Sequence, residues 1–345
     1  MHIGQFISNV VALGHEVWTW PGNNYPAGRR MPSRRIERIM TLRQMDVVYV
    51  RIEWAPPKEC HWSIAPYRHL IGSPVIVWEF NTVPEQGLIL GRPESEIKKA
   101  IEEFRHYGRG CDLAICVSKS LAEYVKDKLG IKHVLTVPNG SDPELFRPDA
   151  PIAKRMLPFQ DEFNVVWIGS AKQPWNDFDM LREAAQIVWG TESGKNIIFH
   201  IIAPDLAGLM SDLPPNTYYW GAERYEKLPN WLAGMDVGLA LYYPGAAEYG
   251  SPLKVFDYMS SGLAVVSTYH PQIEEVLEEV GQSSLLVPAN DAPALAHVLL
   301  DLALNREQAR KLGQVCRQRI IDFYNWRRAT EDTLCEIDIL LKERK

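Results

Sequence analysis

The sequence predicts an α/β protein in which two parallel-sheet units follow one another along the chain. With 345 residues, the chain is long enough for two domains that each bury a core. Short apolar stretches rich in β-branched residues alternate with stretches of helical period, which is typical of parallel strands covered by helices. This alternation breaks in the Pro-rich, polar stretch 138–160, so we expect the two units to join there.

The expected strands are short apolar runs that end at polar or turn-forming residues, and the expected helices carry an apolar side chain every three to four positions. In the first unit, strands are expected at 16–20, 46–50, 74–80, 112–117 and 134–137, and helices at 3–13, 33–43, 94–107 and 119–129. In the second unit, strands are expected at 164–168, 197–202, 217–219, 237–241, 264–267 and 284–287, and helices at 177–189, 228–233, 252–261, 273–279 and 293–302.

The composition is that of a folded protein. Hydrophobic residues make up 46% of the chain and 11 residues are Trp, which is too much apolar surface for a disordered chain. No uninterrupted apolar run approaches the ~20 residues of a membrane span, and the first residues lack the pattern of a secretory signal. The five cysteines (60, 111, 116, 316 and 335) form no CxxC pair, so we expect a reduced, cytoplasmic protein without structural zinc.

The charge is unevenly distributed. A net charge of −6 argues against a nucleic-acid binder, and it divides into +2 for the first 150 residues and −8 for the rest. The dense basic cluster consists of Arg29, Arg30, Arg34, Arg35 and Arg38. The cluster predicts either a solvated helix face or contact with an anionic acceptor or lipid surface, which would place the protein at the periphery of a membrane.

The segment 242–267 contains the most informative motif. Ser251 is a good N-cap, Pro252 suits the first helical position, and Gly262 can end the helix in a left-handed conformation. A loop rich in small residues thus delivers a helix N-terminus to the end of a strand. Free N–H groups and the helix dipole there favour an anion such as a diphosphate, and Lys254 in the first turn would add positive charge.

Two acidic residues flank this helix start. Glu248 precedes the helix and could accept hydrogen bonds from sugar hydroxyls, and Asp257 could reach the ribose of a nucleotide. The same residues are compatible with an ordinary capped helix that carries a surface lysine. From the residues alone, the choice between these two interpretations stays open.

The order of residues from 242 to 267 resembles the donor-binding segment of the retaining GT-B glycosyltransferases, glycosyltransferase family four in particular. In that family the first of two acidic residues contacts the transferred sugar and the second binds ribose hydroxyls. The resemblance implies these roles for Glu248 and Asp257, although Asp257 is shorter than the family's acid and Glu248 precedes it by nine positions instead of eight. The resemblance also implies catalytic roles for Glu248 and Lys254. It implies donor contacts for Tyr249, Gly250, Ser251, Pro252 and Leu253.

Other stretches resemble the family in the right order. They lie at 116–120, 137–148, 221–223 and 323–326. The resemblance implies the GT-B fold, in which two Rossmann-like, doubly wound parallel-sheet domains face a cleft. We expect an acceptor-side domain at 1–148, a domain that binds the nucleotide sugar at 149–325, and a last helix at 326–345 that packs back toward the first domain.

The chain departs from the family at two places. Where members have a Gly-Arg pair and a Lys that grip the donor phosphates, this chain has Gly169, Ser170 and Lys172. Gly169 still allows close backbone approach, and Lys172 is either a phosphate contact or a surface residue. At the N-terminus only 13 residues precede Gly14, so we expect the first strand of the first domain to be absent.

In the first domain, residues 78–81 resemble a strand-end element that lines the cleft. Glu79 and Asn81 are therefore candidates for the acceptor side, and an ordinary exposed strand end is the alternative for Glu79.

The resemblance implies transfer of a sugar from a nucleotide diphosphosugar to a glycan, lipid-linked or small-molecule acceptor with retention of configuration, as in carbohydrate or cell-envelope polysaccharide biosynthesis. No metal and no further cofactor are expected. The departures leave open a catalytically weak or silent binding subunit of the same fold. A nucleotide-sugar 2-epimerase of the same architecture is a further alternative, but the interdomain segment 137–148 and the Ser-Pro-Leu-Lys motif at 251–254 favour the transferase.

Overall fold

The computed structural model describes residues 2–20, 25–52, 55–56, 74–204, 213–245 and 248–344. The chain forms two compact units. Unit 1 consists of Met1–Asn139, Tyr249–Ser251 and Trp326–Lys345, and unit 2 consists of Gly140–Glu248 and Pro252–Asn325. The first division therefore lies after Asn139 rather than after residue 148. The reason is packing, because Phe146 is fully buried in a core of unit 2.

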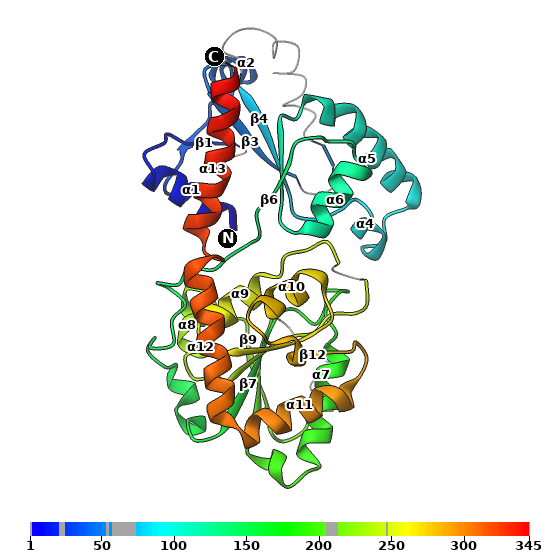
Figure 1. The fold of residues 1–345 in the computed structure, drawn as a ribbon, viewed down its shortest axis with the longest axis vertical. Helices are drawn as coiled ribbons and strands as arrows, with labels where there is room; N and C mark the ends of the chain where they lie inside the picture. The colour runs from blue at the N-terminus through cyan, green and yellow to red at the C-terminus, as the bar shows by residue number, and fades with distance from the viewer. Residues whose placement is uncertain are drawn as a thin grey trace. The chain divides into compact units, whose positions relative to one another are not determined.

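Unit 1 is built on a four-stranded parallel sheet of order β3-β4-β5-β6 (Figure 1). Its strands are β3 (Val47–Ile52), β4 (Val75–Phe80), β5 (Leu113–Cys116) and β6 (Val134–Thr136). One face packs against Phe104 of α5 (Glu94–Tyr107) and Leu121 of α6 (Lys119–Asp127). The other face packs against Ile337 of α13 (Trp326–Glu343), which also contacts α1 (His2–Ala12). Helices therefore cover both faces of this sheet.

The N-terminal segment differs from the expectation. The expected strand 16–20 is reduced to β1 (Trp18–Thr19), which pairs with β2 (Arg29–Arg30) in a separate two-stranded sheet. Within the described part of the chain, no strand precedes α1. The four strands of the main sheet follow one another without a gap, so the sheet is continuous without a further strand.

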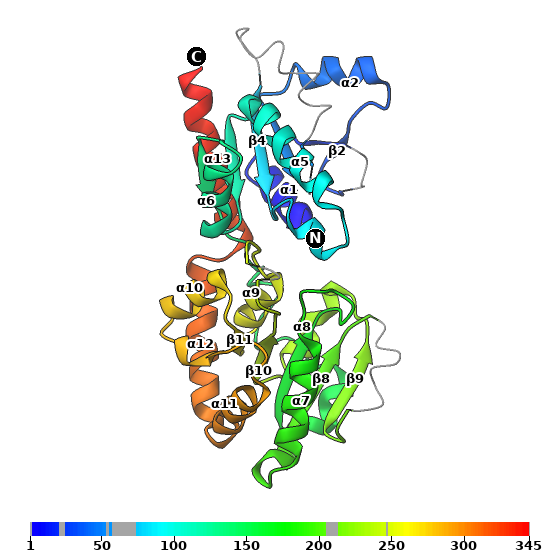
Figure 2. The same ribbon diagram turned by 90° about the vertical axis from the view of Figure 1, so that its right-hand side faces the viewer.

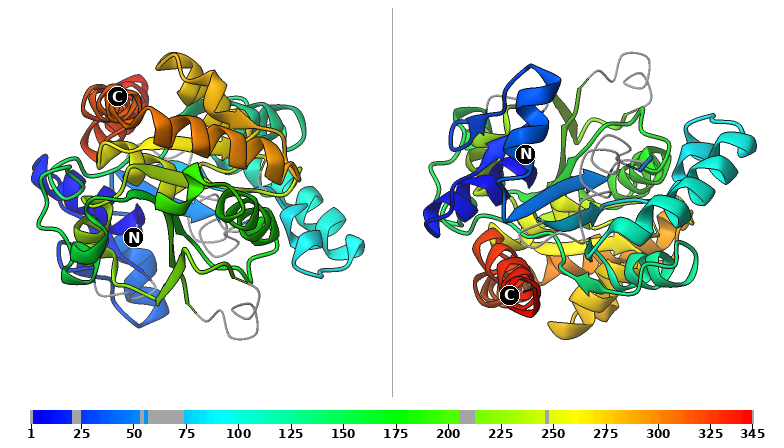
Figure 3. Two further views of the ribbon diagram at one scale, coloured as in Figure 1. Left: turned by 90° about the horizontal axis from the view of Figure 1, so that it is seen from below. Right: turned by 90° about the horizontal axis from the view of Figure 1, so that it is seen from above.

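Unit 2 is a doubly wound sheet of six parallel strands in the order β12-β11-β10-β7-β8-β9. Its strands are β7 (Phe163–Ile168), β8 (Ile197–Ile202), β9 (Thr217–Gly221), β10 (Val237–Ala240), β11 (Ala264–Thr268) and β12 (Leu286–Val287). Its helices are α7 (Phe178–Trp189), α8 (Leu228–Leu232), α9 (Leu253–Ser260), α10 (Pro271–Glu279), α11 (Ala292–Leu304) and α12 (Arg306–Asp322). One core packs α7 and α11 on the sheet, and a second core packs α8, α9, α10 and α12, so helices again cover both faces (Figures 2 and 3).

Short elements complete the described chain. They are α2 (Arg35–Leu42), α4 (Gln86–Ile89) and 3-10 helices at Gly108–Gly110, Lys154–Phe159, Ser193–Asn196, Tyr225–Lys227 and Ser283–Leu285. None of the helices that the structure describes has the length and apolar character that a bilayer crossing needs.

The chain order along the sheet of unit 2 reverses at β7. From β7 the chain continues to β8 and β9 on one side, and β10, β11 and β12 lie on the other side. The carboxyl ends of β7 and β10 therefore form a topological switch point, and ligands of open α/β sheets bind in the crevice outside such a point. The loops expected to bind an anion follow these two strands.

Helix α9 is fixed on the sheet by Tyr258. Its ring lies directly on Gly238 of β10, where a Cβ would be 2.3 Å from the ring, so only glycine fits. Its hydroxyl accepts a hydrogen bond from the N–H of Ile168 at 2.8 Å. These contacts orient α9 against the end of β7.

Candidate functional site

Two loops meet at the switch point of unit 2 and are tied together by main-chain hydrogen bonds. One loop leads from β7 to α7, and the other follows β10. The N–H of Asp177 donates to the carbonyl of Leu241 at 3.1 Å, and the N–H of Tyr243 donates to the carbonyl of Trp175 at 3.0 Å. These bonds fix the position of one loop against the other.

Lys254 is half-buried, and its amine lies in a largely aromatic environment at this point. Its Nζ lies 5.1 Å from the centroids of both the Trp167 and Tyr242 rings, and it donates to Oδ1 of Asn176 at 3.4 Å. Two rings and one neutral amide replace only part of the hydration that an ammonium group loses. Burial therefore lowers the pKa of Lys254 from 10.5 to about 7, and no carboxylate of the described residues offsets this shift. Such an amine is suited to an anionic ligand.

The start of α9 is one residue later than expected. The N-cap is Pro252, and the helix begins at Leu253. Ser251 does not cap the helix, and its hydroxyl accepts a hydrogen bond from the N–H of Asn139 at 3.1 Å. No side chain caps α9, so N–H groups of its first turn remain available to a ligand beside Lys254.

Gly169 lies against Lys254. A Cβ at Gly169 would lie 3.3 Å from Nζ of Lys254 and 2.9 Å from the ring of Trp167, so a side chain would displace the amine. The carbonyl of Ser170 accepts a hydrogen bond from Nδ2 of Asn176 at 2.9 Å. Lys172 is exposed further along the loop. The structure thus brings Gly169, Ser170 and Lys254 together and leaves Lys172 on the outer surface of the loop.

Asp257 is buried on α9 and is bound by two hydroxyl groups. Its Oδ1 accepts hydrogen bonds from Ser141 at 2.6 Å and from Tyr225 at 3.3 Å. These bonds offset only part of the desolvation of the carboxylate, so burial raises the pKa of Asp257 to about 7. Among the described residues none donates to Oδ2, which leaves one oxygen for a ligand hydroxyl.

The other residues expected near the start of α9 are divided between the units. Glu248 is exposed and belongs to unit 2, as do Pro252 and Leu253. Tyr249–Ser251, which includes Gly250, packs with unit 1.

In unit 1, Glu79 lies at the end of β4 and is only 1% exposed, so it is not an ordinary exposed strand-end residue. Its carboxylate accepts hydrogen bonds from the hydroxyl of Tyr49 at 2.7 Å and from Nδ2 of Asn81 at 2.6 Å. Burial, together with the neighbouring Glu79, raises the pKa of Tyr49 well above its usual value. A cavity of about 20 Å³ adjoins this group, and Asn81 is half-buried.

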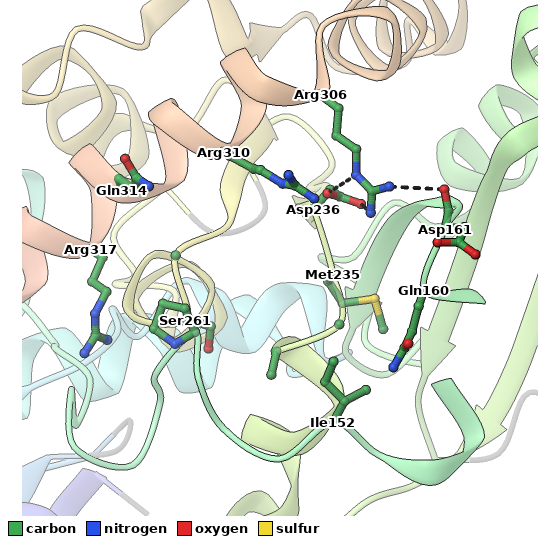
Figure 4. Close-up of a pocket in the computed structure, with 14 residues that line it drawn as sticks. Ile152, Gln160, Asp161, Met235, Asp236, Ser261, Arg306, Arg310, Gln314 and Arg317 are labelled. Carbon is green, nitrogen blue, oxygen red and sulfur yellow. Dashed lines mark hydrogen bonds and ion pairs between the residues drawn. The ribbon is translucent and has the colours of Figure 1, made fainter. Parts of the chain in front are cut away.

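A larger cavity, of about 620 Å³, lies in unit 2, at the edge of its sheet opposite to the switch point (Figure 4). It is lined by residues that precede β7 and β10, which places it at the amino ends of these strands. Asp236 accepts hydrogen bonds there from Nε and Nη2 of Arg306 at 2.8 Å and 3.0 Å. None of the site residues expected from the sequence lines this cavity.

The basic cluster does not form a single helix face. Arg29 and Arg30 lie in β2, Arg34 is the N-cap of α2, and Arg35 and Arg38 lie in α2. Arg29 is paired with Glu16 at 2.6 Å and Arg34 with Glu37 at 3.5 Å. Contact of this segment with an anionic surface stays a prediction.

The sequence did not indicate the side chains that contact Lys254 and Asp257 of α9. Asn176 and Tyr242 lie around Lys254, and Ser141 and Tyr225 bind Asp257. The position of Asn176 directly before a helix N-cap was an available signal. Ser141 is 116 residues from Asp257, and no local pattern marks a contact over that separation.

Comparison with known proteins finds relatives for both units. The family Glycosyltransferase Family 4 matches residues 4–145, and the family Glycosyl transferases group 1 matches residues 162–305. TuaH of Bacillus subtilis (strain 168), a glycosyltransferase named for teichuronic acid biosynthesis, is 28% identical over 176 residues. This match covers 48% of the chain and 42% of TuaH, so it spans less than half of that relative.

Solved structures share the fold at low sequence identity. Sucrose-phosphate synthase from Thermosynechococcus elongatus has a TM-score of 0.68 at 16% identity, with 99% of this chain and 93% of that chain covered. HepE of Anabaena, solved in complex with UDP-glucose, has a TM-score of 0.69 at 12% identity, with 99% and 95% covered. At these identities the likeness establishes the fold.

Proposed function

The chain belongs to the GT-B glycosyltransferases of family 4 and group 1, and from this premise we propose that it transfers a sugar from a nucleotide diphosphosugar to an acceptor with retention of configuration. The observation that carries the proposal is the amine of Lys254 beside the uncapped N-terminus of α9, at the switch point of unit 2. The helix dipole and the ammonium group both favour the two negative charges of a diphosphate. The UDP-glucose bound to HepE supports a UDP-sugar as the first donor to test.

In the proposed reaction, protein groups stabilise the charge that develops on the leaving diphosphate. Lys254 supplies positive charge, and the first-turn N–H groups of α9 supply hydrogen bonds. Because the pKa of Lys254 is about 7, the amine is partly neutral before the donor binds, and an anionic donor favours its protonated form. The proposal requires no metal ion and no further cofactor.

The remaining donor contacts follow from their positions around Lys254. Gly169 and Ser170 allow the phosphates to approach the backbone, and the exposed Lys172 adds positive charge further along the loop. Asp257 binds a ribose hydroxyl through Oδ2. Glu248 contacts the transferred sugar.

The acceptor is proposed to bind unit 1, where the carboxylate of Glu79 orients the amide of Asn81. Glycans and lipid-linked sugars are the proposed acceptor classes, in line with the teichuronic acid biosynthesis for which TuaH is named. The segment with Arg29, Arg30, Arg34, Arg35 and Arg38 would then attach the protein to the inner face of a membrane through anionic lipid headgroups.

A panel of radiolabelled UDP-, GDP- and ADP-sugars, each with and without an acceptor, tests the proposal. We expect one donor to lose its sugar to an acceptor, and proton NMR of the product to show the anomeric configuration of the donor. Donor binding without any sugar release would favour a silent subunit. Conversion of the donor to its 2-epimer would favour an epimerase.

Replacing Glu248 with glutamine is expected to lower turnover about 10- to 100-fold, because a charge-assisted hydrogen bond to the sugar is weakened. The affinity for the free nucleoside diphosphate should stay unchanged, since that ligand carries no sugar. Steady-state kinetics and calorimetry measure the two effects, with the exposed Glu278 changed to glutamine as the matched control. Full turnover in Glu248→Gln would assign the sugar contact to another residue.

Replacing Asp257 with asparagine is expected to weaken donor and free nucleoside diphosphate alike by about tenfold, because both carry the ribose. Loss of sugar discrimination with intact nucleotide affinity would instead place Asp257 at the sugar.

The same variant changes the pH dependence of stability. The native pKa of about 7 lies above the unfolded value of about 3.9. Between these values the native state binds the extra proton, so stability falls as the pH rises from about 4 to 7. Asparagine resembles the protonated form, so Asp257→Asn should be more stable than the wild type at pH 8, as urea unfolding would show. Equal urea midpoints at pH 8 would contradict the raised pKa.

A further inference from the structure

The loop before α9 passes through unit 1 for three residues. Tyr249–Ser251 packs with unit 1, whereas Glu248 before it and Pro252 after it belong to unit 2. Because Pro252 is the N-cap of α9, Ser251 is the residue directly before the start of the helix.

Ser251 is held by Asn139 through two hydrogen bonds. The main-chain N–H of Asn139 donates to Oγ of Ser251 at 3.1 Å, and its Nδ2 donates to the carbonyl of Ser251 at 2.8 Å. Two bonds between the same two residues fix both distance and orientation. No side chain caps the first turn of α9, which follows directly.

Ser118 binds Tyr249, the first residue of the segment. Its hydroxyl donates to the carbonyl of Tyr249 at 2.9 Å and also accepts from the N–H of Leu121 as the N-cap of α6. The ring of Tyr249 packs on the ring of Tyr124 with centroids 5.3 Å apart. Both ends of the three-residue segment are therefore anchored in unit 1.

The position of Asn139 carries a cost in free energy. Its Oδ1 is buried, and among the described residues no group donates to it. A buried acceptor without a donor is unfavourable. This cost favours a role for Asn139 beyond packing.

We infer that Asn139 and Ser118 are positioning residues for donor binding: they hold Tyr249–Ser251 so that the first turn of α9 and Lys254 converge on the diphosphate. This inference rests on the proposed function. Linkage is reciprocal, so a donor that orders the start of α9 should also strengthen the packing of Tyr249–Ser251 against α6 in unit 1.

The test uses the full chain and three probes, UDP-glucose, GDP-mannose and ADP-glucose, with affinities from calorimetry. Asn139→Ala removes the Nδ2 donor without adding charge. Ser118→Asp keeps an N-cap for α6, but an ionised carboxylate cannot donate to the Tyr249 carbonyl. Ser118→Thr keeps both functions. We expect the first two variants to bind the donor about 3- to 10-fold more weakly and the threonine variant to stay within about twofold of the wild type.

Donor-induced changes in hydrogen exchange distinguish a positioning role from a purely structural one. In the wild type, the donor should slow exchange in α9 and also in α6. In Asn139→Ala, it should still protect α9 but protect α6 less than in the wild type, because only the Ser118 and Tyr124 contacts still anchor the segment.

The outcomes separate the inference from the proposed function. Wild-type affinity and undiminished protection of α6 in Asn139→Ala and Ser118→Asp would overturn the inference and leave the proposed function standing. An equal loss in Ser118→Thr would show that Ser118 acts only through packing. If the wild type bound none of the three probes, the donor assignment itself would be wrong, and the inference would fall with it.

Discussion

Replacing Lys254 with methionine is expected to weaken the binding of a nucleotide diphosphosugar at least tenfold. Methionine keeps an unbranched apolar stem between Trp167 and Tyr242 but has no ammonium group. A hydrogen bond to a charged group contributes about 1.5–3 kcal/mol, and about 1.4 kcal/mol corresponds to a factor of ten. Calorimetry with UDP-glucose, GDP-mannose and ADP-glucose measures the loss.

The matched control is Lys311→Met, which removes an exposed lysine of α12 that is paired with Glu307. It should leave donor affinity unchanged. Unchanged affinity in Lys254→Met as well would remove Lys254 from the donor site.

The pH dependence of donor affinity gives a second measure of the same amine. The pKa of Lys254 is about 7 in the free protein, and a bound diphosphate raises it by stabilising the protonated form. Below pH 7 the amine is already charged, so affinity is at its maximum. Above pH 7 binding must take up a proton, so affinity falls by up to tenfold per pH unit until the pKa of the complex is reached. Lys254→Met should lack this fall.

Without ligand, Lys254→Met is expected to be more stable than the wild type. The native pKa of about 7 lies below the unfolded value of about 10.4, so between these values the unfolded state binds the extra proton and stability rises with pH. Below pH 7 the cost of burying the charge is fully present. Urea unfolding should therefore show the largest gain near pH 6. A loss of stability would mean that the contacts of the amine outweigh its desolvation.

How well the sequence predicts the site is clearest at α9. The Ser-Pro pair and Gly262, which has φ of 77°, mark this helix locally, and the Lys in its first turn indicates an anion. The start lies one residue later than the Ser-Pro pair predicts, and the Ser251 hydroxyl binds Asn139, 112 residues away, instead of capping the helix. A contact over such a separation leaves no local pattern, and the same holds for the partners of Asp257.

The parallel sheets of both units followed from hydrophobic alternation, but the N-terminal segment did not. Residues 16–20 have the composition of a strand, and strand composition does not specify a partner. The segment pairs with β2 through the N–H of Arg29 on Val17 and the N–H of Met31 on Thr19, outside the main sheet. The position of Arg29 and Arg30 in a strand follows from this pairing and not from their charge.

Removing the carboxylate of Asp236 is expected to lower the free energy of unfolding by about 2–3 kcal/mol. The carboxylate is nearly buried and binds three donors: Nε and Nη2 of Arg306, and the N–H of Asn164 at 2.9 Å. It thereby ties the starts of β7, β10 and α12 together. Asp236→Ala leaves a half-buried guanidinium without its carboxylate, and the melting temperature should fall by roughly 4–12 °C for a unit of this size. Thermal unfolding of Asp236→Ala, Arg306→Met and the double variant measures the coupling.

The same variants also decide between the two edges of the sheet. Asp236 and Arg306 line the large cavity at the amino ends of the strands, whereas Lys254 lies at the carboxyl ends. If the donor binds at the switch point, Asp236→Ala should retain wild-type donor affinity below its melting transition, while Lys254→Met loses affinity without losing stability. A folded Asp236→Ala protein with strongly reduced donor affinity would move the donor to the cavity at the opposite edge, and α9 would then be a helix with a half-buried lysine and no diphosphate to bind.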